Sequence, residues 1–165
     1  MSDEPGNHQY VPGVGNTVTI QPKLKPMKNS SHNRPIYFPT IETDRLLLRL
    51  LMLEDTDFIF QHFSDPQVTQ YLMDEPPVAD YDQAREIINF YLEPESKTHN
   101  RWGIVRKDDQ RLIGTCGFHR WEKAYFRADI GYDLSPDCWG QGYMSEALRA
   151  VLKNGFERMG LNRID

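Results

Sequence analysis

The sequence predicts an α/β domain in which helices flank a sheet containing antiparallel strands. Three strand-like segments follow one another between residues 102 and 134, and a short turn separates the first two. Amphipathic helical patterns precede these strands, and a longer one follows them. Because strands and helices alternate along the chain, the two kinds of element are expected to pack together in layers.

The first 38 residues differ from the rest of the 165-residue chain. They are polar, they contain scattered prolines, and no hydrophobic period persists in them. We therefore expect a disordered polar tail at residues 1–38 and one folded domain at 39–165. No internal repeat is detected.

Residues typical of helix starts locate two of the helices that precede the three strands. Asp65 and Pro66 suit the cap and first position of a short helix. Asp80 and Gln83 have the spacing of a capping box, which predicts a helix after residue 80. The predicted elements are a strand at residues 45–50 and helices at 53–63, 65–72 and 80–91.

The three strands are predicted at residues 102–106, 111–121 and 126–134. The first two form a hairpin around residues 107–110. In the third, the even-numbered residues from Phe126 to Leu134 share one apolar face, and Asp129 and Asp133 lie on the other.

A helix with an apolar stripe from Met144 to Met159 follows, and Gly160 ends it. Phe156 is expected to continue this stripe. Residues 161–165 have the pattern of the first residues of another strand.

A glycine turn, Trp139-Gly140-Gln141-Gly142, runs directly into the last helix. Glycine lets the backbone approach a ligand closely and adopt positive φ. The start of a helix offers free N–H groups and a positive dipole end, which together favour a phosphate. The alternative is a tight turn that needs glycine for geometry alone.

The segments Ala128-Asp-Ile-Gly-Tyr-Asp-Leu-Ser-Pro136 and Trp139-Gly-Gln-Gly-Tyr-Met-Ser-Glu-Ala-Leu148 resemble the acetyl-CoA-binding region of the GNAT acetyltransferases, in particular their RimJ/RimL-like branch. The resemblance covers residues 40–165. It implies a mixed, mostly antiparallel sheet flanked by helices. The first position of the family motif, Gln or Arg, falls on Asp137, so this chain departs from the motif there.

The resemblance implies an N-acetyltransferase that moves an acetyl group from acetyl-CoA to a primary amine by direct attack in a ternary complex. The amine would belong to a protein N-terminus or a small cationic molecule, and the resemblance is compatible with a homodimer. The implied cofactor contacts are Ile130, Tyr132, Leu134, Trp139, Gly140, Gln141, Gly142, Tyr143, Met144 and Ser145.

Asp129 falls where some members of the family carry a catalytic glutamate, so the resemblance implies that it acts as the base. Aspartate is one methylene shorter, which favours a bridging water. The alternative is that Asp129 pairs across strands with a base such as Arg120. His119 is a second candidate base, and Cys116 and Cys138 have no partner base placed by sequence.

Proteins of the family continue past the position that matches Asp165, so the resemblance implies a sheet truncated at its fifth strand. A chain without the closing elements would bind acetyl-CoA poorly and turn over little. We expect a fragment of a functional acetyltransferase.

Composition excludes several classes of partner. The formal net charge is −5, which argues against nucleic acid. The two cysteines give no disulfide framework and indicate a reducing, cytoplasmic compartment. No apolar run is long enough to span a membrane, and no metal is expected. Two rival functions remain open: a noncatalytic acyl-CoA-binding or interaction module, and an α/β domain without affinity for CoA.

Overall fold

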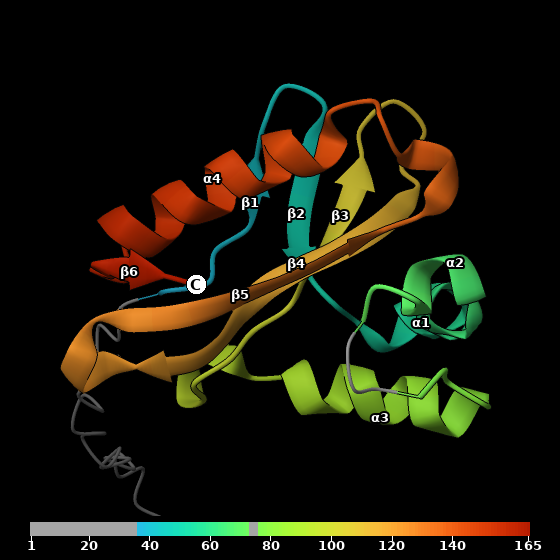
Figure 1. The fold of residues 1–165 in the computed structure, drawn as a ribbon, viewed down its shortest axis with the longest axis horizontal. Helices are drawn as coiled ribbons and strands as arrows, with labels where there is room; N and C mark the ends of the chain where they lie inside the picture. The colour runs from blue at the N-terminus through green and yellow to red at the C-terminus, as the bar shows by residue number, and fades with distance from the viewer. Residues whose placement is uncertain (1–35, 73–75) are drawn as a thin grey trace, which may run out of the picture. The chain divides into compact units, whose positions relative to one another are not determined.

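A computed structural model describes residues 36–72 and 76–165 of the chain (Figure 1). Within them, one sheet has the strand order β1-β2-β3-β4-β5-β6. Neighbouring strands are antiparallel except β5 and β6, which are parallel. The strands are β1 (Ile41–Glu42), β2 (Leu46–Leu50), β3 (Trp102–Arg106), β4 (Leu112–Glu122), β5 (Arg127–Leu134) and β6 (Arg163–Ile164).

Helices cover both faces of this sheet (Figure 1). The helix that follows the glycine turn, α4 (Tyr143–Glu157), packs on one face, where Ala147 and Val151 join Phe118 in the larger core. The opposite face carries a smaller core in which Ile59 and Ile88 meet Leu51. The helices there are α1 (Thr56–Ser64), α2 (Pro66–Thr69) and α3 (Tyr81–Tyr91).

The predicted helix caps form with one difference. The side chain of Asp65 accepts a hydrogen bond from the Gln67 amide at the start of α2. The side chain of Asp80 accepts from the Gln83 amide at the start of α3, but the Gln83 side chain reaches the amide of Ala79 instead of Asp80. The predicted reciprocal capping box is therefore only half formed.

One prediction about faces is wrong, and another misses burial. Asp133 lies on the face of β5 opposite to Leu134, as predicted, but it is 6% exposed and lies in a buried polar cluster. Phe156 was placed on the buried stripe of α4, yet it is 48% exposed, because Asn154 and Gly155 take the buried positions of the last turn.

The predicted truncation at a fifth strand is not supported, because the sheet has six strands within the described residues. The short strand β1 was not foreseen. Residues 161–165 do contribute a strand, β6, which pairs with Arg127 and Ala128 of β5.

The predicted tail lies mostly outside the described residues, so its disorder stays a prediction. Phe38, at the end of the predicted tail, is 3% exposed and belongs to the larger core. No helix among residues 36–72 and 76–165 is long and apolar enough to cross a membrane.

Candidate functional site: a glycine turn and two adjoining pockets

The glycine turn opens α4 in the way its sequence predicts. Gly140 and Gly142 both have positive φ, 72° and 80°, a conformation that other residues rarely adopt. Gly142 is the cap residue of α4, and no side chain caps the helix there. The amides of Tyr143, Met144 and Ser145 therefore have no partner within the helix and can donate to a ligand.

Arg45, just before β2, holds this turn. Its guanidinium donates to the carbonyl of Gln141 at 3.1 Å and forms an ion pair with Glu146 at 2.7 Å. It also lies 4.4 Å from the ring centre of Tyr143. The start of α4 is thus tied to the sheet, and a cation lies beside the free amides.

Asp137 is the position at which this chain departs from the family motif. It forms an ion pair with Arg111, which directly precedes β4. The hydrogen bonds from Arg111 lower the pKa of Asp137 below its ordinary value. Because the two charges neutralise each other, Asp137 adds little negative charge to the anion site.

A cavity of about 600 Å³ lies between this turn, the end of β5 and α2. Its wall is mainly apolar, as is usual for the sites of small molecules. It is lined by Val68, Tyr71, Leu72, Tyr132, Asp133, Leu134, Cys138, Trp139, Gly140, Gly142, Tyr143, Met144 and Ser145. We call it the turn pocket.

The edge of β5 beside this pocket is open. The amide of Ser135 bonds to β4, whereas the amide of Ile130 bonds to the carbonyl of Asp165 on the other side. Because hydrogen-bond directions alternate along an antiparallel strand, the amides of Tyr132 and Leu134 also point away from β4. The two-residue strand β6 does not extend far enough to pair with them.

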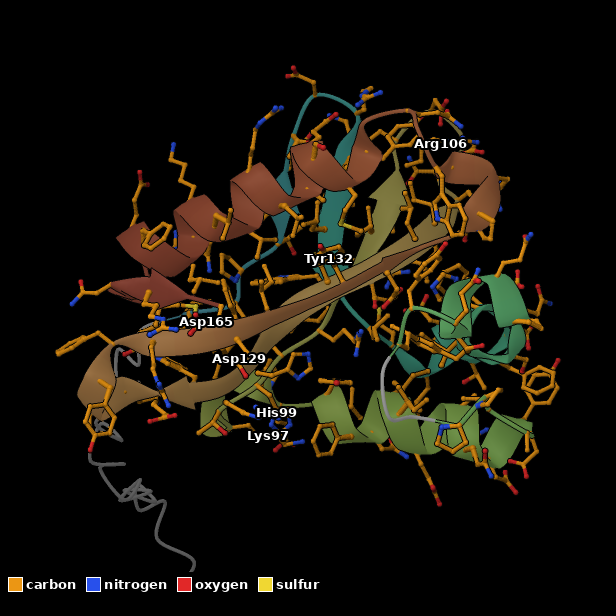
Figure 2. All side chains as sticks on the ribbon, viewed as in Figure 1. Lys97, His99, Arg106, Asp129, Tyr132 and Asp165 are labelled. Atoms are coloured by element: carbon orange, nitrogen blue, oxygen red, sulfur yellow. The ribbon has the colours of Figure 1, made fainter. Side chains whose placement is uncertain are left out.

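A second cavity, of about 1130 Å³, adjoins the first and lies between α3 and β5. The two cavities share Tyr71, Leu72 and Tyr132. We call the second one the side cleft. A molecule in the turn pocket and another in the side cleft would therefore meet beside Tyr132, whose position on β5 is seen in Figure 2.

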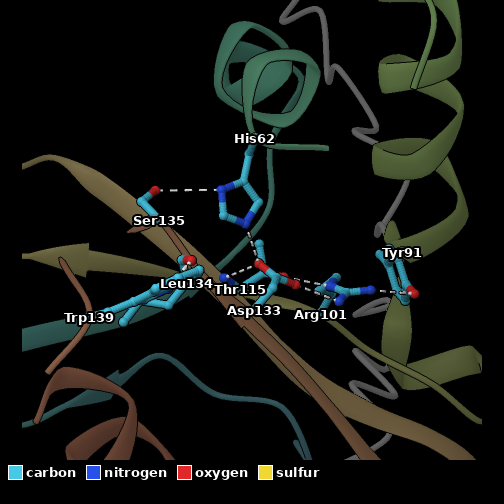
Figure 3. Close-up of polar contacts among 8 residues, drawn as sticks. All are labelled: His62, Tyr91, Arg101, Thr115, Asp133, Leu134, Ser135 and Trp139. Carbon is cyan, nitrogen blue, oxygen red and sulfur yellow. Dashed lines mark hydrogen bonds and ion pairs between the residues drawn. The ribbon is translucent and has the colours of Figure 1, made fainter. Parts of the chain in front are cut away.

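A buried polar cluster lies behind both cavities (Figure 3). Asp133 of β5 is its centre: one carboxylate oxygen is 2.7 Å from Nε2 of His62 in α1, and the other is 2.8 Å from Nη2 of Arg101. Thr115 of β4 donates from its hydroxyl and its amide to the same carboxylate. Arg101 also donates to the hydroxyl of Tyr91 in α3 at 3.1 Å.

The charges in this cluster compensate one another. Burial alone would raise the pKa of Asp133, but Arg101 and His62 hold it below its ordinary value. The cluster links α1, α3 and β4 to β5, which lines both cavities. Its hydrogen bonds therefore hold the walls of both cavities in position.

Comparison with known proteins gives the family. The model of the acetyltransferase (GNAT) domain family matches residues 45–165. The uncharacterized N-acetyltransferase p20 of Bacillus licheniformis is 43% identical over 128 residues, which span 76% of this chain and 71% of that protein. The chain belongs to the GNAT acetyltransferase family.

Further relatives agree with this assignment. The uncharacterized N-acetyltransferase YoaA of Bacillus subtilis is 41% identical over 77% of this chain and 72% of its own length. A GNAT-family acetyltransferase from Bacillus anthracis has a similar structure, with a TM-score of 0.65 at 27% identity over 76% of this chain and 71% of that one. The curled, mostly antiparallel sheet flanked by helices is therefore the GNAT fold.

The turn pocket of this GNAT domain brings together eight of the ten predicted cofactor contacts. The other two lie elsewhere. Ile130 lines the side cleft, and the side chain of Gln141 is exposed and donates to the carbonyl of Asp137.

The predicted base, Asp129, forms an exposed ion pair with Arg120 at 3.1 Å, which is the alternative that the sequence left open. Its neighbour across the β4–β5 ladder is His119, which lines the side cleft. Burial, followed by the charge of Arg101, lowers the pKa of His119 to about 4. His119 is therefore neutral at pH 7.

Sequence reasoning missed His62, Arg101 and the central role of Asp133. His62 lies on the buried side of α1 together with Ile59 and Phe63, and Arg101 precedes β3 in a loop. The one available signal was the acidic residue in the otherwise apolar run Tyr132-Asp133-Leu134, since a charge beside a core strand usually has a buried partner.

Proposed function

We propose that this GNAT domain transfers the acetyl group of acetyl-CoA to a primary amine, on a small cationic molecule or a protein N-terminus. The observation that carries this proposal is the meeting of the turn pocket and the side cleft at Tyr132. On the segment Trp139–Leu148 we further propose that the chain belongs to the RimJ/RimL-like branch.

The residues of the turn pocket fit acetyl-CoA, which supplies an acetyl group activated as a thioester. The uncapped start of α4, with the nearby cation of Arg45, suits its pyrophosphate. A side chain at Gly140 would project into open space, so the backbone there is accessible to a large ligand. The open edge of β5 suits the amides of the pantetheine arm, which would pair with it as an added strand does.

Direct transfer is favoured because no activated nucleophile lies among the described residues near the junction. Burial raises the pKa of Cys116 to about 12, and burial also raises that of Cys138. In a direct transfer, the protonated amine first loses one proton to the base. The neutral nitrogen then bonds to the carbonyl carbon as the carbon–sulfur bond breaks, and the second proton lost from nitrogen ends on sulfur. The amide of Tyr132, which points away from β4, would donate to the carbonyl oxygen.

Asp129 is the proposed base, acting through a water molecule. Asp129 lines neither cavity, but its neighbour across the β4–β5 ladder, His119, lines the side cleft. A water molecule would therefore have to carry the proton from the amine to the Asp129 carboxylate, whose side chain is 40% exposed. His119 is the weaker candidate, because its low pKa leaves it little tendency to take up a proton at pH 7.

The test is acetyl-CoA turnover by Asp129→Asn, followed as thiol release. We expect kcat to fall about 100-fold, within the usual range for a general base, while the Kd for acetyl-CoA stays unchanged. The control is Asp108→Asn, which removes another exposed carboxylate in an ion pair with an arginine, Arg106, in the turn between β3 and β4. Equal turnover by Asp129→Asn and the parent chain would rule out Asp129 as the base.

The ion pair between Asp129 and Arg120 favours the second candidate function, a noncatalytic acyl-CoA-binding module, because it gives the carboxylate a structural role. That function predicts acetyl-CoA binding without thiol release for any amine. Thiol release that depends on an added amine would exclude it.

A further inference from the structure

The side cleft has walls rich in aromatic rings. Tyr71, Phe90 and Tyr132 line it, and they are 70%, 54% and 52% exposed. Large apolar side chains exposed together in a concave surface mark a binding site more often than a solvent-facing wall. Two further rings, those of Phe63 and Tyr91, are buried behind the cleft surface.

Helix α3 presents one continuous side to this cleft. Gln83, Glu86, Ile87 and Phe90 all line it, and their spacing of three, one and three residues places them on a single face of a helix. The helix therefore offers the cleft an apolar ring at one end and polar groups nearer its N-terminus. This gradient suits a molecule with an apolar body and a polar group.

The charges of the cleft are few. Glu86 is its one acidic lining residue among those described, and no described residue bonds to its carboxylate. Arg101 lines the cleft, but its guanidinium is matched by Asp133 and also bonds to Tyr91. His119 is neutral at pH 7. Among the lining residues that the structure describes, which exclude residues 73–75, the one unpaired charge is the negative charge of Glu86.

We propose that the acceptor of this acetyltransferase is an arylalkylamine, a primary amine carried on an aromatic body. The aromatic body packs between the rings of Tyr71, Phe90 and Tyr132, where ring-on-ring contacts add to the burial of apolar area. Glu86 draws the protonated amine into the cleft. The inference rests on the proposed function, since it names the acceptor class of the same site.

A polyamine fits these walls less well. Each of its ammonium groups needs a carboxylate or several carbonyl groups once it leaves water. The described lining residues offer one carboxylate, Glu86, and a wall of rings. Rings attract one ammonium through cation–π contact, but they leave the remaining charges of a polyamine without partners.

The experiment compares three acceptors with the 165-residue chain and acetyl-CoA: 2-phenylethylamine, 2-cyclohexylethylamine and spermidine. The first two have similar size and the same charge, and they differ in the aromatic ring. We expect kcat/KM for phenylethylamine to exceed that for cyclohexylethylamine about threefold and that for spermidine at least about tenfold. Higher kcat/KM for spermidine, or equal values for the two monoamines, would overturn the proposal.

Two variants locate the effect. Phe90→Leu should raise KM for phenylethylamine about tenfold and leave KM for acetyl-CoA unchanged. The matched control is Phe156→Leu, which removes a similarly exposed ring from α4 that lines neither cavity. Glu86→Gln should raise KM for every cationic amine, with Glu157→Gln on α4 as its control. A KM unchanged in both Phe90→Leu and Glu86→Gln would overturn the proposal.

Binding separates this inference from the proposed function. A chain saturated with CoA should bind phenylethylamine in calorimetry even where turnover is slow. If the chain binds CoA and transfers acetyl groups to other amines but neither binds nor acetylates phenylethylamine, the acceptor class is wrong and the proposed function stands. If the folded chain binds no acetyl-CoA, the proposed function fails and the acceptor class fails with it.

Discussion

Asp133 holds several elements of the site together, although it has no proposed role in catalysis. Its carboxylate receives bonds from α1, from β4 and from the loop before β3 (Figure 3). The first two are buried and the third, from Arg101, is partly buried. A buried carboxylate is tolerated only when such partners compensate for lost hydration. The same residue lies between Tyr132 and Leu134, which line the turn pocket.

Removing this carboxylate should therefore be costly. We expect Asp133→Ala to lower the free energy of unfolding by about 3–5 kcal/mol, because it leaves Arg101 and His62 buried without their acceptor. Chemical denaturation at pH 7 measures this. The control Asp137→Ala removes an exposed partner of Arg111 and should cost less than about 1 kcal/mol. Similar losses for the two variants would contradict the role given to the cluster.

The pKa of His119 gives a second test at this scale. Burial lowers it to about 4, so the unfolded chain binds the proton more tightly than the folded one. Stability contributed by His119 is then fully present above the unfolded value of about 6.5 and is lost as the pH falls toward 4. NMR titration of the His119 ring should give a midpoint near 4. A midpoint near 6.5 would mean that the imidazole of His119 is more exposed to solvent than it is in the structure. His119 would then again be a candidate base.

At the scale of elements, the close pairing of β4 with β5 sets the position of the open edge. Gly114 of β4 leaves no room for a side chain, since a Cβ there would lie 2.3 Å from the carbonyl oxygen of Asp133. At Gly131 of β5, a Cβ would meet only the ring of His119, at 3.0 Å. The two glycines therefore differ in what surrounds them: backbone at one, a movable side chain at the other.

We accordingly expect Gly114→Ala to push the two strands apart and to cost at least about 3 kcal/mol, the upper part of the range for overpacking. Gly131→Ala should cost less than about 1.5 kcal/mol, because the His119 ring can shift. Thermal unfolding of the two variants, side by side, measures the difference. Equal losses would mean that β4 and β5 can separate locally at little cost.

The elements also show which features of this fold a sequence can reveal. Long periodic segments such as α3 and α4 were predicted within a few residues, because a buried stripe needs several turns to be recognised. The strand β1 has two residues and no period to detect. The alternation of β5 gave the correct face for Asp133 but not its burial, because that burial depends on Arg101 and His62, which are distant in the sequence.

At the scale of the whole domain, the geometry of the glycine turn was predictable because it is local: two glycines of positive φ lead into a helix start without a side-chain cap. The side cleft was not predictable, because α3 and β5 contribute to it together with α2. The meeting of the two cavities at Tyr132 follows from the packing of helices on both faces of the sheet, which no single segment encodes.

The central claim is that the turn pocket binds acetyl-CoA, and calorimetric titration of two glycine variants tests it most directly. Gly142→Val places a side chain at the start of α4, whereas Gly160→Val puts the same strain on a glycine of similar φ, 70°, beyond the end of that helix. We predict that the parent chain and Gly160→Val bind acetyl-CoA and that Gly142→Val, still folded, binds it at least about tenfold more weakly. Equal affinity in both variants, or no binding by the folded parent chain, would contradict the account.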